Sequence, residues 1–85
     1  MDVEIKRILE KINDPIKERL YSISKAIEFT SYGMDINGTM ANERFTGKLE
    51  GIVTTLVDLN VITLYEYDVL FEYFLNYYHE EGENE

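Results

Sequence analysis

Few side chains in this sequence could carry chemistry, and the single histidine is the first candidate. His79 stands near the C-terminus beside Tyr78 and Glu80. A zinc site needs three or four nitrogen, sulfur or oxygen ligands that converge on one point, and the chain offers no cysteine. We therefore interpret His79 as a solvated residue at a helix end, and we expect neither a metal nor another cofactor.

Asp68 and Glu72 are the second candidate, because carboxylates four residues apart share one face of a helix. Such a pair can divide general acid and base roles when the environments of its two groups differ. Here both residues fall on the polar face of the expected helix, where nothing distinguishes them. With one histidine and no cysteine, a Ser/His/Asp or Cys/His arrangement is not credible either. The sequence predicts that the protein is not an enzyme.

Charge is distributed unevenly along the 85 residues, whose net charge is −9. Residues 1–50 contain nine acids and eight bases, whereas residues 51–85 contain eight acids and no Lys or Arg. A surface of this kind repels phosphate backbones and anionic membranes and attracts basic proteins. We therefore expect a basic protein surface as the partner, without direct nucleic-acid binding and without membrane binding.

Neither a signal peptide nor a membrane span is expected. The N-terminus mixes acids with bases and lacks a continuous apolar run. The most apolar stretch, residues 51–64, is interrupted by Asp58 and Asn60 and is too short to cross a bilayer. We expect a cytoplasmic protein with a single helical domain over residues 1–80 and an acidic frayed tail over residues 81–85.

Apolar residues recur every three to four positions through most of the chain, which predicts helices. A break is expected at residues 13–15, where Asp14 can act as N-cap and Pro15 can take the first helical position. The alternative is one long helix kinked at Pro15. The expected apolar stripes before and after this break are Ile5, Ile8, Leu9 and Ile12, then Ile16, Leu20, Ile23 and Ile27.

The main loop is expected over residues 32–38, with Gly33 ending the second helix and Asn37-Gly38 forming a turn. Either Thr39 or Asn42 could cap the third helix. The third helix carries a narrow apolar seam of the type found in bundles. Its members are Phe45, Leu49, Ile52, Leu56 and Leu59.

Thr63 and Glu66 form a capping box, which predicts that a fourth helix begins at about residue 64 and runs to about residue 81. The short connection before it makes the third and fourth helices antiparallel neighbours. The expected fold is all-α, a small bundle of three to four helices with a C-terminal antiparallel helical hairpin. The inner face of the fourth helix is expected to contain Leu64, Tyr67, Leu70, Phe71, Phe74 and Tyr78.

Segment 56–67, LVDLNVITLYEY, resembles the turn of the short C-terminal (SHOCT-type) hairpins found at the ends of many bacterial proteins. Those hairpins read as Leu, a small-residue turn, Val-Ile-Thr, two residues and then Glu-aromatic. Asn60 stands where Gly is usual, and Phe71 and Glu72 stand where basic residues tend to follow. We interpret the segment as a general capped helix turn and assign the chain to no family.

Gly47 and Gly51 lie one turn apart within the third helix. Each interior glycine costs a helix about 1 kcal/mol relative to alanine, so a compensating close contact is expected. Two interpretations stay open: tight packing against the first or second helix of the same chain, or a seam for self-association.

The outward face of the fourth helix combines acids with tyrosines. Tyrosine supplies rigid contact area and a hydroxyl group, and for that reason it anchors many interfaces. We predict that this face binds a partner. Its residues are Tyr65, Asp68, Val69, Glu72, Tyr73, Asn76 and Glu80.

Two functional hypotheses follow from these features. In the first, the protein is a non-enzymatic binding module that docks its acidic, Tyr-bearing face on a basic, nucleic-acid-binding protein surface. Its extreme form is an inhibitor from a phage or other mobile element, such as an anti-CRISPR or a DNA mimic. In the second, the protein is a homodimeric structural or assembly module with a helix seam around Gly47 and Gly51. The two are compatible, since a dimer would present two acidic faces.

Overall fold

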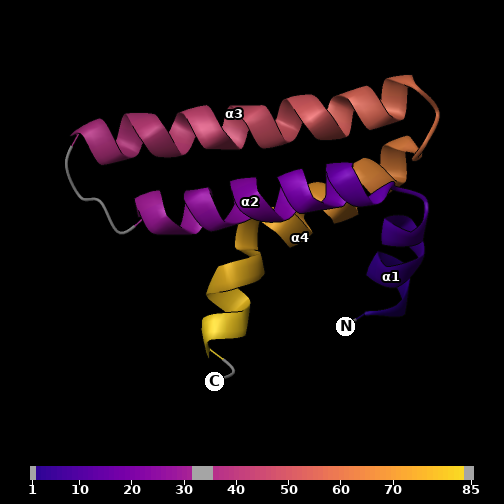
Figure 1. Cartoon of the computed structure of the whole chain (residues 1–85), viewed down its shortest axis with the longest axis horizontal. Coiled ribbons are helices and arrows are strands. Elements are labelled where there is room, and N and C mark those ends of the chain that lie inside the picture. Colours follow the sequence, from indigo (N-terminus) through magenta and orange to yellow (C-terminus); the bar gives the residue numbers. More distant parts are fainter. Residues whose placement is uncertain (1, 32–35, 84–85) are drawn as a thin grey trace.

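The computed structural model describes the backbone of residues 2–31 and 36–83, and their side chains except at residues 36–38 and 78–83. The described residues form four helices: α1 (Val3–Glu10), α2 (Asp14–Ser31), α3 (Ile36–Asp58) and α4 (Leu64–Glu83). In Figure 1, α2 and α3 lie side by side, α4 returns from the end of α3 and crosses behind α2, and α1 covers one end. This confirms the expected fold class, a small all-α bundle.

The chain breaks at Pro15 as expected, but the capping residue is one position earlier than predicted. Asn13 caps α2, because its side-chain Oδ1 accepts a hydrogen bond from the backbone N–H of Ile16 at 3.0 Å. Asp14 is instead the first residue of the helix, where its carboxylate forms an ion pair with Lys17 at 3.1 Å. A carboxylate in the first turn also complements the positive end of the helix dipole.

The third helix starts earlier than the glycine and asparagine signals indicated. Because α3 begins at Ile36, the expected turn at Asn37-Gly38 lies within the helix, and neither Thr39 nor Asn42 is its cap. The expected role of Gly33 lies outside the described residues. Asn42 instead joins two helices, since its Nδ2 donates hydrogen bonds to the Ile27 carbonyl at 2.8 Å and the Thr30 hydroxyl at 3.1 Å.

The connection between α3 and α4 is specified by local interactions. The Asn60 N–H donates to the Val57 carbonyl and the Val61 N–H donates to the Leu56 carbonyl, both at 2.9 Å, which is a Schellman ending. Asn60 has a φ of 61°, the left-handed conformation that glycine usually supplies in such a motif. Asparagine tolerates this conformation better than most residues, which explains how the turn forms with Asn60.

The predicted capping box at the start of α4 is confirmed. The Glu66 carboxylate accepts a hydrogen bond from the Thr63 N–H at 2.8 Å, and the Thr63 hydroxyl accepts one from the Glu66 N–H at 3.1 Å. Two backbone N–H groups that lack helical partners are thereby satisfied. The local sequence therefore fixes both sides of the turn that sets α4 against α3.

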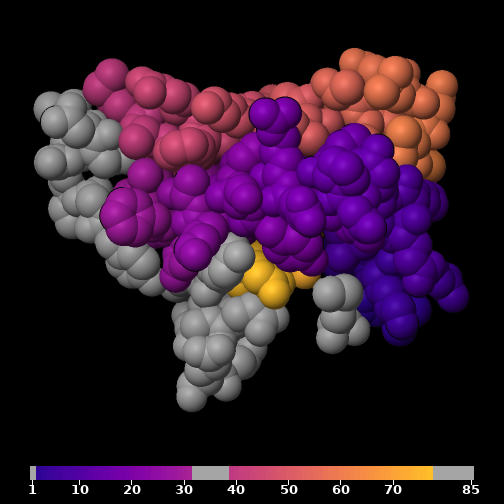
Figure 2. Space-filling model, in the orientation of Figure 1, coloured from indigo at the N-terminus to yellow at the C-terminus, as the bar shows by residue number. Residues whose placement is uncertain are grey.

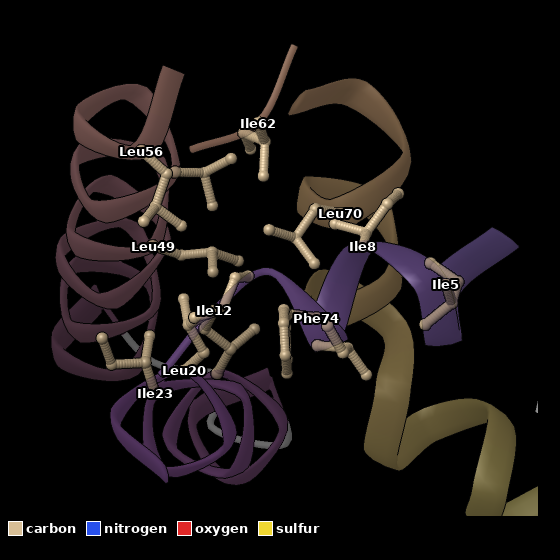
Figure 3. Close-up of a cluster of buried hydrophobic side chains, with 13 residues drawn as sticks. Ile5, Ile8, Ile12, Leu20, Ile23, Leu49, Leu56, Ile62, Leu70 and Phe74 are labelled. Carbon is tan, nitrogen blue, oxygen red and sulfur yellow. The ribbon is translucent and has the colours of Figure 1, made fainter. Parts of the chain in front are cut away.

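All four helices contribute to one hydrophobic core (Figure 3). Fully buried residues lie where α2, α3 and α4 meet, namely Leu20, Leu49, Leu70 and Phe74. Ile8 of α1 is also fully buried and packs at the end of this core. Burial of large aliphatic and aromatic side chains is the main stabilising term in a domain of this size. The buried hydrophobic residues are Ile5, Ile8, Leu9, Ile12, Leu20, Ile23, Ile27, Leu49, Val53, Leu56, Ile62, Leu70 and Phe74.

Two residues expected in the core lie outside it. Leu59 is 68% exposed and Leu64 is 74% exposed. Both flank the turn between α3 and α4, where the chain has already left the helix–helix contact. Ile62 fills that end of the core instead, and Tyr78, which was expected on the inner face, has a side chain outside the described set.

Candidate functional site

Four of the predicted partner-binding residues form a continuous exposed line on α4. Tyr65 is 69% exposed, and Asp68, Glu72 and Asn76 are also exposed. Their spacings of three and four residues place them on one face of the helix. We call these four residues the acidic stripe. Neither carboxylate of the stripe forms an ion pair with another residue in the described part of the chain.

Val69 and Tyr73 do not belong to this free surface, which corrects the sequence interpretation of the outward face. Both are half-buried and pack against the core. The Tyr73 ring meets the Tyr21 ring edge-to-face with centroids 6.4 Å apart, and their hydroxyl oxygens lie 3.2 Å apart. The correction has a simple cause: α4 packs against both α2 and α3, so less of it faces outward than a hairpin alone would leave. The side chain of Glu80 lies outside the described residues.

At its first residue, the acidic stripe meets acids of α1. Tyr65 and Glu66 share a shallow depression with Asp2, Glu4 and Arg7. A hydrogen bond with the Glu4 carboxylate, together with the negative charge of that group, raises the pKa of the Tyr65 hydroxyl above its ordinary value of 10.0. The hydroxyl is thereby tied to the first turn of α1.

Glu66 has a structural role distinct from that of the stripe. Its Oε2 accepts a salt bridge from Lys11 at 2.7 Å, which joins α4 to the residue after α1. The Lys11 ammonium and then the Thr63 N–H hold the pKa of the Glu66 carboxyl below its ordinary value of 4.5. This acid of the C-terminal half is therefore neutralised within the molecule, whereas Asp68 and Glu72 are left to the solvent.

The two helical glycines lie on the open side of α3. Gly47 and Gly51 are both exposed, and a Cβ atom added at either position would meet nothing within 4 Å. The predicted tight packing against the first or second helix is therefore wrong. Packing within the monomer does not explain either glycine.

A groove between α2 and α3 was not anticipated from the sequence. It has a volume of about 670 Å³ and is lined on the α2 side by Ile16 and Ile23, and on the α3 side by Phe45 and Ile52. Phe45 and Ile52 were predicted as members of the apolar seam of the third helix, but nothing in their spacing indicated an open groove beside α2. Figure 2 shows the face on which α2 and α3 lie together.

The described residues contain no group of three or more His, Cys, Asp or Glu side chains that could hold a metal ion. Among these described residues, no helix is long enough and apolar enough to cross a membrane. Comparison of the chain with protein-family models, with curated proteins and with solved structures gave no match. A functional interpretation must therefore come from the exposed surfaces themselves.

Proposed function

We propose that this chain is a non-enzymatic, cytoplasmic binding module that docks its acidic stripe on a basic protein surface. The observation that carries the proposal is the exposure of Tyr65, Asp68 and Glu72 on one helix face, in the half of the chain that has no Lys or Arg. A basic partner would find two carboxylates that nothing in the described part of the chain neutralises.

The dimensions of the stripe suit a helix that lies along a partner. From Tyr65 to Asn76 the helix rises by about 17 Å. A contact of that length would cover part of a protein–protein interface of standard size. Tyr65 would bury its ring against the partner and serve as the anchor, since aromatic residues dominate binding energy at interface centres. The acids would steer association and set specificity for a positive surface.

The strongest form of this proposal is inhibition. Surfaces that bind nucleic acids are rich in Lys and Arg, so a rigid negative helix competes with the phosphate backbone for the same groove. A phage or mobile-element inhibitor of the anti-CRISPR or DNA-mimic kind would work in this way.

The test is a charge-reversal experiment on a partner captured from the native host by the wild-type protein. We expect Asp68→Lys combined with Glu72→Lys to weaken binding at least about tenfold, and Tyr65→Ala to weaken it by a similar factor. Tyr65 is the suitable aromatic target because Tyr73 also holds α2. Affinity is measured by calorimetry at several salt concentrations.

The matched control changes the same charge on a different helix. Glu43 and Glu50 are exposed acids of α3, and reversing both alters the net charge as much as reversing Asp68 and Glu72. We expect this control to keep most of the affinity. Unchanged affinity in the α4 variants would reject the stripe as the binding surface, and equal losses in both pairs would show a response to net charge alone.

The open glycines favour a second candidate, a homodimeric assembly module with a seam at Gly47 and Gly51. Since a methyl group placed at either glycine would have no neighbour within 4 Å, another backbone could approach α3 closely there. Light scattering at micromolar concentration tests this candidate. The assembly module would be supported if the wild-type chain were a dimer and if Gly47→Leu and Gly51→Leu each dissociated that dimer. A wild-type chain that is strictly monomeric would eliminate this candidate.

A further inference from the structure

The groove between α2 and α3 is lined mainly by apolar residues. Its apolar lining residues are Ile16, Ile23, Phe45, Ile52, Leu56 and Leu59. Leu56 and Ile23 are buried in the groove floor, whereas Leu59 is 68% exposed at one end. An exposed leucine beside such a floor is apolar surface that the monomer leaves in contact with water.

The shape of the groove suits a helix. On the α3 side its lining runs from Phe45 to Leu59, a rise of about 21 Å or four helical turns, and on the α2 side it runs from Ile16 to Ile23, a rise of about 10 Å. Gly51 and Thr55 line the same wall, and small residues at this point allow a second helix to approach closely. Helices that dock in this way place apolar anchors at successive turns into the groove.

The charge of the groove identifies the chemistry of its occupant. The only charged residues among its lining are two bases, Arg19 and Lys48, in a chain whose net charge is −9. Within the described residues neither base forms an ion pair with a carboxylate. Lys48 lies over the Phe45 ring, 5.4 Å from its centroid, so its charge is held at the edge of the apolar floor.

A second copy of the chain is a poor occupant. If two grooves faced each other across a two-fold axis, Arg19 and Lys48 of both copies would gather in one interface, and like charges would oppose association. The acidic stripe of another copy has the right charge, but its exposed large apolar side chains, Tyr65 and the neighbouring Leu64, both lie at the N-terminal end of α4. Anchors confined to one end cannot fill a groove of this length.

We propose that the groove between α2 and α3 binds an amphipathic helix of a partner protein, with apolar anchors for the floor and flanking carboxylates for Arg19 and Lys48. This surface is separate from the acidic stripe, because its lining comes from α2, α3 and Leu59. The protein would thereby hold an acidic partner segment on one surface and a basic partner surface on the other. Neither contact requires the other.

The test uses a displayed library of helical peptides about 14 residues long, which matches the groove. Apolar residues are fixed at helical spacing and the other positions are randomised. We expect the wild-type protein to select peptides enriched in Asp and Glu over Lys and Arg. The affinity of the best peptide is then measured by fluorescence anisotropy with the full-length chain.

Two pairs of matched variants locate the binding site. Gly51→Leu places a side chain in the groove wall and should weaken peptide binding at least about tenfold. Gly47 is exposed on the same helix but does not line the groove, so Gly47→Leu should leave peptide binding unchanged. Arg19→Glu with Lys48→Glu should reverse the selected charge preference. Lys25→Glu with Arg44→Glu, two exposed bases of α2 and α3 that do not line the groove, should leave it unchanged.

Several results would overturn the proposal. These are selected peptides without carboxylate enrichment, no peptide above background, or equal binding to Gly51→Leu and Gly47→Leu. The proposal would also be overturned if the free chain dimerised, and if Gly51→Leu abolished the dimer whereas Gly47→Leu did not. That result would identify a second copy of the chain as the occupant of the groove. Charge reversal at Asp68 and Glu72 should not affect peptide binding, so failure here is distinguishable from failure of the acidic stripe.

Discussion

At the scale of single residues, Glu66 shows how one side chain serves two contacts. One carboxylate oxygen accepts from the Lys11 ammonium and the other from the Thr63 N–H. The first contact ties α4 to the chain beyond α1, and the second completes the start of α4. Local spacing predicted the Thr63 contact. The Lys11 partner is distant in sequence and could be seen only once the helices were placed.

Glu66→Gln should destabilise the protein by about 1 kcal/mol at neutral pH, since a cap and a charge-assisted bond are both weakened. The lowered pKa of the Glu66 carboxyl means that its ionised form stabilises the fold above the ordinary value of 4.5. This contribution is lost as pH falls through the lower folded-state pKa. The difference between the variant and wild type should therefore shrink in acid.

Urea unfolding at about pH 7 and about pH 3 measures that difference directly. Glu72→Gln is the control, because Glu72 is exposed and its side chain caps nothing; its stability should change by less than about 0.5 kcal/mol at either pH. A Glu66→Gln difference that stays constant with pH would contradict the assigned role of the ionised carboxylate.

At the scale of elements, local signals predicted the helices well and their faces less well. The break at Pro15 and the capping box at Thr63 follow from neighbouring residues, and both are confirmed. The start of α3 was missed because Asn37-Gly38 is a turn signal in sequence, whereas α3 begins at Ile36 and includes both residues. Tyr73 was misplaced because the outward side of α4 depends on where α2 lies, which helical periodicity does not contain.

The open glycines of α3 lead to an element-scale prediction. Gly47→Ala and Gly51→Ala should each stabilise the protein by up to about 1 kcal/mol, because a methyl group meets nothing within 4 Å and alanine favours the helix. Urea unfolding of the two single variants and of the double variant checks this. Destabilisation of the free chain by either change would contradict the open placement of these residues.

At the scale of the whole molecule, a small core must hold four helices together. Fully buried residues from α2, α3 and α4 converge at Leu20, Leu49, Leu70 and Phe74 (Figure 3). All four positions were predicted from helical spacing. The groove could not be predicted, because an exposed apolar channel depends on how far apart two helices lie. The same is true of the outward face of α4, because only four of its seven predicted residues, those of the acidic stripe, are exposed among the described side chains.

Leu70→Ala should cost about 2–5 kcal/mol, the range for creating a cavity at a fully buried leucine. A domain of this kind has only about 5–15 kcal/mol of total stability, so a large fraction would be lost. Thermal and urea unfolding measure the change. Leu59→Ala is the matched control, because Leu59 is 68% exposed and its truncation should change stability by less than about 0.5 kcal/mol. Equal effects at the two leucines would contradict the placement of the core.

The aromatic contacts between α2 and α4 also give the molecule an optical property. The sequence has seven tyrosines and no tryptophan, and the Tyr21 ring lies edge-on to Phe74 at 4.9 Å and to Tyr77 at 5.2 Å. We expect tyrosines fixed in such an asymmetric cluster to contribute to the near-ultraviolet circular dichroism of the chain. The part of that signal that comes from Tyr21 should report the docking of α4 on α2, whereas the far-ultraviolet signal reports helix content. Whether the two bands disappear together distinguishes concerted unfolding from the release of one helix.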